Sequence, residues 1–384
     1  MVTFAASLAG TSLQRTERDL TVPVLTYRSI LPNELDAGLV RRWRELQERD
    51  EAYASPYFCP EFTQAVARVR RDVEIAVIEA DGAIVGFFPF QRAGFGIARP
   101  VGGPFSDYHG VIAQPDVPWR VDELMRAARL SVWAFDHLAG ATRAFAAYVR
   151  RQATSPQIDL AGGFEEFEKH LKATESDFLE NTRRKARKIA REIGELRFEY
   201  HDPGALQQMI EWKSAQYRRS HPSGIDVVFV NPWATGLVRE IAGVQQPDGF
   251  AGVCSSLYAG DRLVAVHMGM RSRTHWHYWL PSYDVELSKY SPGSILLLRM
   301  VETAQARGIQ IIDLGKGDST YKSRVMTGTY PLLEGAVELP SLMSMVRRTA
   351  RAAELGASSL PMLSSVLNLP ARVLRKIERD RRFS

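Results

Sequence analysis

The sequence contains few cysteines and no long apolar run. Cys59 and Cys254 are the only cysteines among 384 residues, which is too few for a disulfide framework or a zinc site and fits a reducing compartment. No stretch approaches the roughly 18 apolar residues that span a bilayer. Residues 1–10 are mildly apolar but lack the basic start and the full apolar segment of a signal peptide. We therefore expect a cytoplasmic protein, with peripheral attachment to the inner membrane as an alternative.

Excess positive charge is absent from most of the chain. The formal net charge is +5, but residues 341–384 hold nine Lys/Arg and three Asp/Glu, so the remainder is close to neutral. From Val366 to Arg379, apolar and basic residues recur at helical spacing, which predicts an amphipathic helix with a basic face. This helix either lies on an anionic membrane surface or packs its apolar face on the protein. No nucleic acid is expected as a partner.

Two stretches of the chain show the same order of predicted elements. Residues 25–160 alternate between apolar strands and helices, with a hairpin signal at Asp81-Gly82. Residues 164–340 begin with a long helical stretch and continue through three antiparallel strands, a helix and a buried strand, and "EGAVELP" is expected to close this second sheet. The length also favours two domains.

The fold class is therefore α/β. We expect a disordered N-terminus, two domains and a basic amphipathic helical tail, at residues 1–21, 22–162, 163–340 and 341–384.

One part of the second stretch resembles a known family. An apolar helix opens with Ser291-Pro292-Gly293, and the next strand ends in Asp313-Leu314-Gly315-x-Gly317, followed by Tyr321-Lys322. Together with "LVAVHMGMRS" and the basic helix "NTRRKARKIARE", this combination resembles the GNAT acyltransferases of the FemAB-like, CelD/BcsL (cellulose biosynthesis protein) type. The resemblance implies two tandem GNAT-like domains, each a mixed β-sheet flanked by helices, with a degenerate first domain and a catalytic second domain.

The resemblance also implies a reaction. Such enzymes transfer an acyl group by direct attack, and acyl-CoA serves as a co-substrate rather than a tightly bound cofactor. The chain lacks the Arg/Gln-x-x-Gly-x-Gly/Ala loop of standard GNAT enzymes, so an aminoacyl-tRNA donor stays open. The expected acceptor is the amine of a membrane-lipid precursor, as in ceramide-synthase-like members. An exopolysaccharide such as cellulose, or a non-catalytic scaffold role in polysaccharide secretion, is the alternative.

The candidate donor site is the start of the predicted helix. Backbone N–H groups and the helix dipole at such a start can bind a pyrophosphate, and Gly293 permits close approach of a ligand. An ordinary helix cap is the alternative. The candidate cofactor-binding residues are Ser291, Pro292, Gly293 and Ser294.

The candidate catalytic residues follow from the strands around this helix. His267 is the candidate general base, because a neutral imidazole can accept a proton near pH 7; a buried structural histidine is the alternative. Asp313 is the second candidate base, and Tyr321 and Lys322 are a candidate general acid and phosphate contact. His275 and His277 share a strand face without a third ligand, so no metal is expected. The candidate substrate-binding residues, with turn capping or a solvated face as their alternatives, are Arg271, Tyr283, Asp284, Arg184 and Arg187.

Overall fold

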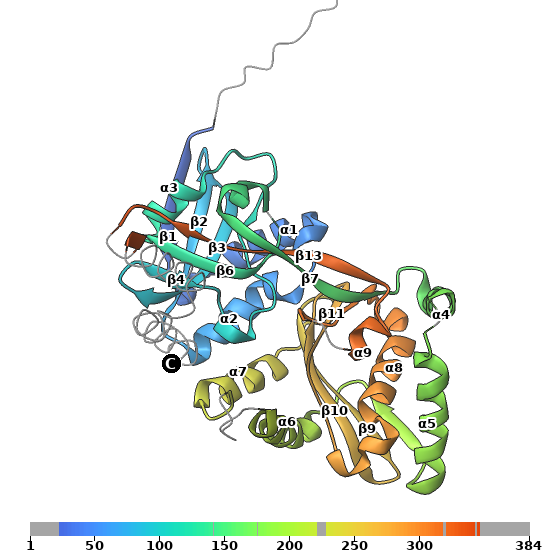
Figure 1. Ribbon diagram of the computed structural model, residues 1–384. Coiled ribbons are helices and arrows are strands. Elements are labelled where there is room, and N and C mark those ends of the chain that lie inside the picture. Colours follow the sequence, from blue (N-terminus) through green and yellow to red (C-terminus); the bar gives the residue numbers. More distant parts are fainter. Residues whose placement is uncertain are drawn as a thin grey trace, which may run out of the picture.

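The computed structural model describes residues 23–345, with the exception of 141, 175, 221–227, 318–319 and 342–343. The predicted disordered N-terminus and the predicted amphipathic helix at 366–379 lie outside the described residues. Within them, no helix is long and apolar enough to cross a membrane. The described strands form one mixed sheet that runs through both halves of the molecule (Figure 1).

The strand order of this sheet is β1-β2-β3-β4-β6-β13-β7-β12-β11-β10-β9-β8, and β5 pairs with β3. The first-half strands are β1 (Leu25–Ile30), β2 (Val73–Ala80), β3 (Ala83–Gly94), β4 (Ile97–Arg99), β5 (Ile112–Ala113), β6 (Val132–Leu138) and β7 (Val149–Asp159). The second-half strands are β8 (Leu196–Glu199), β9 (Ala251–Ala259), β10 (Arg262–Arg271), β11 (His275–Tyr283), β12 (Ile311–Asp313) and β13 (Gly328–Glu338).

Each half contains one parallel strand pair, β4 with β6 and β11 with β12, among antiparallel neighbours. The predicted α/β fold, with mixed strands flanked by helices, is confirmed, but the two predicted sheets are parts of one continuous sheet. The hairpin predicted at Asp81-Gly82 joins β2 to β3, and Asp81 has the positive φ of 50° that such a turn requires.

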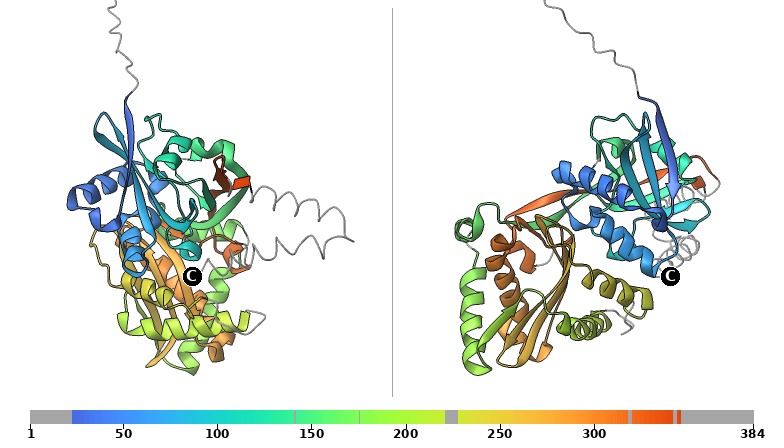
Figure 2. Two further views of the ribbon diagram at one scale, coloured as in Figure 1. Left: turned by 90° about the vertical axis from the view of Figure 1, so that its left-hand side faces the viewer. Right: turned by 180° about the vertical axis from the view of Figure 1, so that it is seen from behind.

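Helices cover both faces of the sheet (Figures 1 and 2). On one face, four helices from both halves share a single apolar core with the strands, and Trp43, Phe62, Met209 and Leu237 are fully buried there. These helices are α1 (Ala37–Arg49), α2 (Pro60–Val69), α6 (Leu206–Ser220) and α7 (Pro232–Ala242). The opposite face is covered by α3 (Val121–Ala127) in the first half and by α4 (Gly163–Ala173), α5 (Phe178–Glu192) and α8 (Pro292–Ala304) in the second.

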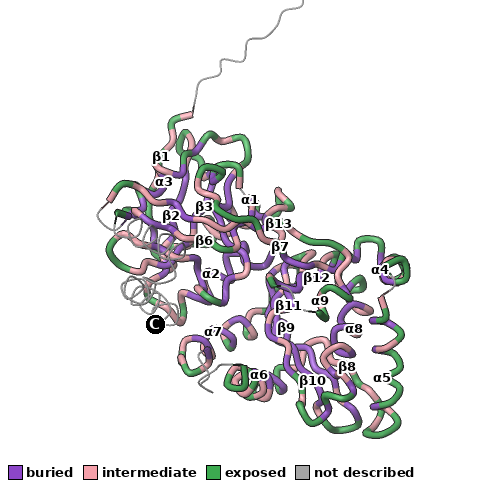
Figure 3. The backbone as a smooth tube through the Cα atoms, in the orientation of Figure 1, coloured by how far each residue is buried: buried purple, intermediate pink, exposed green. Residues whose placement is uncertain are grey.

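The burial pattern follows from these layers. The α8 sequence is apolar on most sides because it packs between β9–β11 and α5. In contrast, α5 is basic along one side, and Figure 3 shows exposed residues along its outer surface. This helix therefore meets the domain through residues such as Ile189 and leaves its cations in solvent.

Two long strands join the halves. The sequence predicts "EGAVELP" as the last strand of the second sheet, but the structure places β13 between β6 and β7 of the first half. In turn, β7 pairs with β12 of the second half. The pattern of alternating residues identifies a strand but not its neighbours, so this exchange could not be read from the sequence.

The fit of β13 against its neighbours depends on a missing side chain at Gly335. A Cβ atom added there would clash with the carbonyl oxygen of Tyr148 and the ring of Phe135. We therefore expect Gly335→Ala to reduce the free energy of unfolding by roughly 1–3 kcal/mol, the usual cost of overpacking. Urea unfolding of the full chain measures it. Gly328→Ala in the same strand meets no atom within 4 Å and should leave stability unchanged; equal effects of both substitutions would contradict this account.

Candidate active site

The strands β11 and β12 pair at only three positions and then diverge. The pairs are His275 with Ile311, Trp276 with Ile312, and His277 with Asp313. Beyond Asp313 the chain follows β7, since the N–H of Leu314 donates to the carbonyl of Pro156. The strand β11 continues to Tyr283 with β10 as its neighbour on one side and no strand on the other. We call this divergence the fork, with His277 and Asp313 at its base and residues 278–283 along its open edge.

A bulge bends β11 where the fork begins. The β10–β11 register shifts between Met268 and Met270, so that two β11 residues lie opposite Gly269. A side chain on Gly269 would clash with the carbonyl of His277 and the ring of His267. The glycine therefore allows the bulge. As a result, the backbone N–H of Trp279 leaves the ladder and donates to Nε2 of His267 over 3.1 Å.

A buried histidine lies between two carboxylates at the base of the fork. Nε2 of His277 is 2.9 Å from Oδ2 of Asp107, and its Nδ1 is 3.4 Å from Oδ1 of Asp313. Burial opposes protonation of this fully buried ring, but the hydrogen bonds and charges of the two aspartates outweigh it and raise the pKa of His277 to about 9. His277 is therefore an imidazolium at neutral pH.

Asp313 is held by both halves of the molecule. Its Oδ1 accepts hydrogen bonds from Ser155 Oγ at 2.8 Å and from the N–H of Gly315 at 2.7 Å. Its Oδ2 accepts from Gln157 Nε2 at 2.9 Å and from the Tyr108 hydroxyl. Burial would raise the pKa of Asp313, but His277 and these donors hold it well below its usual range. The carboxylate is ionised and has no exposed lone pair for a substrate.

Sequence reasoning missed the first-half members of this network. Asp107 and Tyr108 lie in a Gly- and Pro-rich segment that the sequence identifies only as a turn, and Ser155 lies in β7. None forms a motif by itself. Asp107 differs from the other acidic member, because 27% of its side chain is exposed against 5% for Asp313. It is the part of the network that a substrate can reach.

The candidate base His267 has no exposed atom. Its ring stacks on Tyr278 with centroids 4.6 Å apart, and Nδ1 has no hydrogen-bond partner within the described part of the chain. Burial, followed by the charges of His277 and Lys213, lowers the pKa of His267 to about 3. The ring is thus neutral, and its Nε2 lone pair is already used by Trp279.

The candidate donor residues lie together at the start of α8, beside the far end of the open edge. Ser291 has a left-handed backbone, with φ 49° and ψ 56°, and its Oγ accepts a hydrogen bond from Lys185 Nζ of α5 over 2.7 Å. A Cβ atom on Gly293 would meet only Cδ1 of Tyr283, at 3.6 Å. The space next to Gly293 is therefore open, and Tyr283 borders it.

Asp284 follows β11 directly. It accepts a hydrogen bond from the N–H of Glu286 at 3.0 Å and forms an ion pair with Arg262. This geometry matches the capping alternative for Asp284.

The remaining candidates are distributed around the second half. Tyr321, in the short α9 (Thr320–Ser323), is 39% exposed. Lys322 donates from Nζ to the carbonyls of Gly315 and Lys316 and so closes the loop after β12. Arg271 lies at the closed end of β11 and donates to the carbonyl of Pro247. The exposed side chains Arg184 and Arg187 lie on α5.

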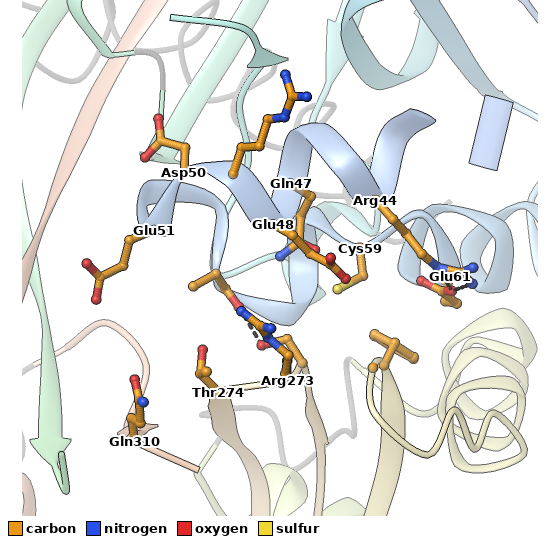
Figure 4. A pocket seen from close by; sticks show the side chains of 15 residues that line it. Arg44, Gln47, Glu48, Asp50, Glu51, Cys59, Glu61, Arg273, Thr274 and Gln310 are labelled. Carbon is orange, nitrogen blue, oxygen red and sulfur yellow. Dashed lines mark hydrogen bonds and ion pairs between the residues drawn. The ribbon is translucent and has the colours of Figure 1, made fainter. Parts of the chain in front are cut away.

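A separate cleft of about 420 Å³ lies between the halves, near the closed end of β11 (Figure 4). Figure 4 shows charged side chains of α1 and the following turn, including Glu48, Asp50 and Glu51, along one side of it, with Arg273 and Thr274 on the other. None of the candidate site residues lines this cleft. Among the described residues, no group of three or more His, Cys, Asp or Glu side chains could hold a metal ion.

Comparison with known proteins identifies the type of domain that contains the fork. Residues 176–323 match the family model of the acetyltransferase (GNAT) domain. This segment is a GNAT-type acetyltransferase domain. The matched segment runs from α5 to α9 and includes His277, Asp313 and the start of α8. The chain therefore carries the domain of an acyl-transferring enzyme. No curated protein sequence matches the chain.

Solved structures are similar to this chain at low sequence identity, and the fold is shared with FemX. The crystal structure of FemX has 9% identity and a TM-score of 0.55, over 80% of this chain and 97% of FemX. The C-terminal domain (DUF2156) of a proposed lysylphosphatidylglycerol synthetase from Agrobacterium fabrum has 12% identity and a TM-score of 0.49, over 81% and 94%. A tandem GNAT protein from the clavulanic acid biosynthesis pathway has 10% identity and a TM-score of 0.46, over 83% and 100%.

The charge of His277 should make stability fall with increasing pH. Its pKa is raised from 6.5 to about 9 in the folded protein, so its contribution is fully present below about pH 6.5 and is lost as the pH rises through 9. We expect a loss on the order of 3 kcal/mol in the free energy of unfolding over this range. Urea unfolding at several pH values measures it.

The control for this titration is a histidine on the same strand. Burial lowers the pKa of His275, so His275→Gln should keep the alkaline loss, whereas His277→Gln should be less stable at pH 6 and show a much smaller loss. An unchanged pH dependence in His277→Gln would show that another group is responsible.

Proposed function

We propose that this chain transfers an acyl group from acyl-CoA to the amine of a membrane-lipid precursor such as a long-chain base. The open edge of β11 carries the proposal. It lies within the GNAT-type domain and runs from the buried His277 to the start of α8. An open strand edge can bind an extended arm that contains amides as an added strand. This arrangement would direct the reactive end of a donor toward the base of the fork.

The donor's phosphates would bind where α8 begins. The residues Ser291–Ser294 provide a helix start, and Lys185 reaches Ser291 from α5. Lys188 and Lys289 lie 5.8 and 4.8 Å from the centre of the Tyr290 ring. These lysines supply positive charge at a helix start without the standard phosphate-binding loop. An aminoacyl-tRNA is the alternative donor, and Arg184 and Arg187 on the exposed side of α5 would contact its phosphates.

The proposed roles of the side chains at the fork follow from how far each one is exposed to solvent. Asp107 binds the acceptor amine and accepts its proton as the new C–N bond forms, because its carboxylate is partly exposed and fixed by His277. Tyr321 protonates the departing thiolate. His267, which is fully buried, orients the Trp279 N–H instead of meeting the substrate. Holding both reactants in place can lower the activation free energy of the transfer by ~7–11 kcal/mol.

The proposal of a lipid acceptor rests on aromatic side chains beside the open edge. The ring of Phe105 lies 5.6 Å from Trp279 and 5.5 Å from Trp233, and 6.3 Å from Phe229. Phe105 is buried, and the three rings around it are partly buried, so they suit a hydrocarbon chain. The basic sequence at 366–379 would add attraction to an anionic membrane. Within the GNAT superfamily, this acceptor and the motifs at 291–322 favour the FemAB-like, CelD/BcsL type.

Turnover measurements test the proposal. Purified protein is incubated with hexadecanoyl-CoA and either sphinganine or a cello-oligosaccharide, and thiol release and acylated products are followed by absorbance and mass spectrometry. Acylated sphinganine supports the lipid acceptor, and an acylated oligosaccharide supports the exopolysaccharide alternative. No acyl transfer to either acceptor would count against this function and favour a scaffold role.

Gly293→Val should weaken donor binding without loss of the fold. The added side chain would fill the space beside the α8 start, where its Cβ atom would meet only Cδ1 of Tyr283, at 3.6 Å. We expect the affinity for hexadecanoyl-CoA, measured by calorimetry, to fall at least tenfold while the melting temperature changes little. Gly243→Val, at the end of α7 on the other face, is the control and should bind normally. Normal binding by a folded Gly293→Val protein would show that the start of α8 does not bind the donor.

Asp107→Asn should reduce acceptor use. The amide keeps the shape of the side chain but accepts no proton, so kcat/KM for sphinganine should fall by roughly 10²–10³-fold. The KM for hexadecanoyl-CoA should stay close to that of the wild type, because the donor site is at α8. Asp136→Asn, an exposed aspartate near His137, is the control. Full activity of Asp107→Asn would show that another group accepts the proton.

A further inference from the structure

A lysine reaches the open edge of β11 from the opposite side of the sheet to α8. Lys213 lies on α6, and only 8% of it is exposed. Its Nζ donates a hydrogen bond to the backbone carbonyl of Pro281 over 3.1 Å. The sequence gives no signal for this residue beyond its place on an amphipathic helix.

The register of β10 and β11 fixes the direction of that carbonyl. The N–H of Asp284 donates to the carbonyl of Val264, so these two residues form a hydrogen-bonded pair. Such pairs alternate with pairs whose backbone groups point outward, and His267 with Pro281 is therefore an outward-pointing pair. The carbonyl of Pro281 faces away from β10, along the open edge. The ammonium group of Lys213 consequently lies at this edge.

The ammonium group has no counter-charge in the described part of the molecule. No carboxylate of a described residue lies within ion-pair distance, and burial lowers the pKa of Lys213 to about 8. Among the described residues, the groups near it are the neutral His267 and the Tyr217 ring, whose centre lies 5.5 Å from Nζ. Burying an unpaired charge is costly, so a group of this kind marks a candidate functional site.

Backbone donors are scarce along the same edge. Pro281 has no N–H, and the N–H of Trp279 is already donated to His267. A carbonyl oxygen that gains negative charge beside Pro281 and Trp279 therefore requires a side-chain donor, because the next outward-pointing N–H on this edge is that of Tyr283. Lys213 still has N–H groups in addition to the one that it donates to Pro281.

We propose that Lys213 is a catalytic residue that binds and polarises the carbonyl oxygen of the transferred acyl group; this inference rests on the proposed acyl transfer. The acceptor nitrogen attacks the thioester carbon, the carbonyl electrons move to oxygen, and the Lys213 ammonium stabilises the oxyanion. The oxyanion then collapses, the C–S bond breaks, and the thiolate leaves and takes a proton from Tyr321. The acceptor's proton passes to the base. Preorganised donors at such a position contribute about 10²–10³-fold to turnover.

Three substitutions test this role in the full chain with hexadecanoyl-CoA and sphinganine. We expect Lys213→Met to reduce kcat by roughly 10²–10³-fold, with the KM for the donor unchanged. Its melting temperature should be equal or higher, since removal of a buried unpaired charge does not weaken the fold. Lys213→Arg, which keeps a cation, should recover part of kcat. Lys169→Met replaces an exposed lysine and should have normal turnover.

A pH profile separates catalysis from a structural effect. In the wild type, kcat should fall above about pH 8 as Lys213 loses its proton, and in Lys213→Arg this fall should move to higher pH. Normal kcat in a folded Lys213→Met protein would overturn the inference, as would a wild-type kcat that does not fall between pH 7 and 9. A wild-type kcat that stays level overturns the inference even if a variant does not fold, and the shift in Lys213→Arg separates this fall from the titration of His277 near pH 9. A wild type without thioester turnover would instead overturn the proposed function.

Discussion

The imidazolium of His277, buried between Asp107 and Asp313, is the interaction on which the geometry of the fork depends. A charge in the interior is tolerated only when it is paired and hydrogen-bonded, and removal of one partner leaves the others uncompensated. Asp107 comes from a first-half loop and Asp313 from a second-half strand, while Ser155 and Tyr108 complete the shell. The network therefore fixes the two halves in one relative position and keeps the base of the fork rigid.

The direction of the chain after β12 follows from this network. Gly315 adopts a positive φ of 74°, and a Cβ atom there would lie 3.1 Å from Oδ2 of Asp107. The backbone N–H of Gly315 can therefore reach Asp313 only because the residue has no side chain. The chain turns away from β11 at this point and leaves the strand edge open. One ionic network thus explains both the junction of the halves and the place where a donor is proposed to bind.

The sequence predicted local features more reliably than long-range ones. The hairpin at Asp81-Gly82, the helix that begins at Pro292 and the strand that ends at Asp313 each have a local signal, such as a turn pair, a helix-starting proline or an apolar run. The motifs at 291–322 also indicated the GNAT-type domain. These signals depend only on neighbouring residues.

The features that the sequence did not predict depend on contacts between residues far apart in the chain. His277 appeared in the sequence only as one of two histidines on a strand face, because its partners Asp107 and Asp313 lie 170 and 36 positions away. The pairing of β13 with β6 had no signal for the same reason. The buried positions of His267 and Lys213 also follow from tertiary packing rather than from periodicity, which cannot distinguish a core residue from one at a cleft.

The exchange of long strands also constrains the order of folding. During synthesis, the first-half strands β6 and β7 leave the ribosome about 190 and 170 residues before β13, the strand that separates them in the sheet. Until then, the inner edges of both strands are unpaired and prone to wrong pairing. The first half can reach its final structure only when the second half is nearly complete. The two halves are therefore a single unit of assembly, although their elements follow one another in the sequence like separate domains.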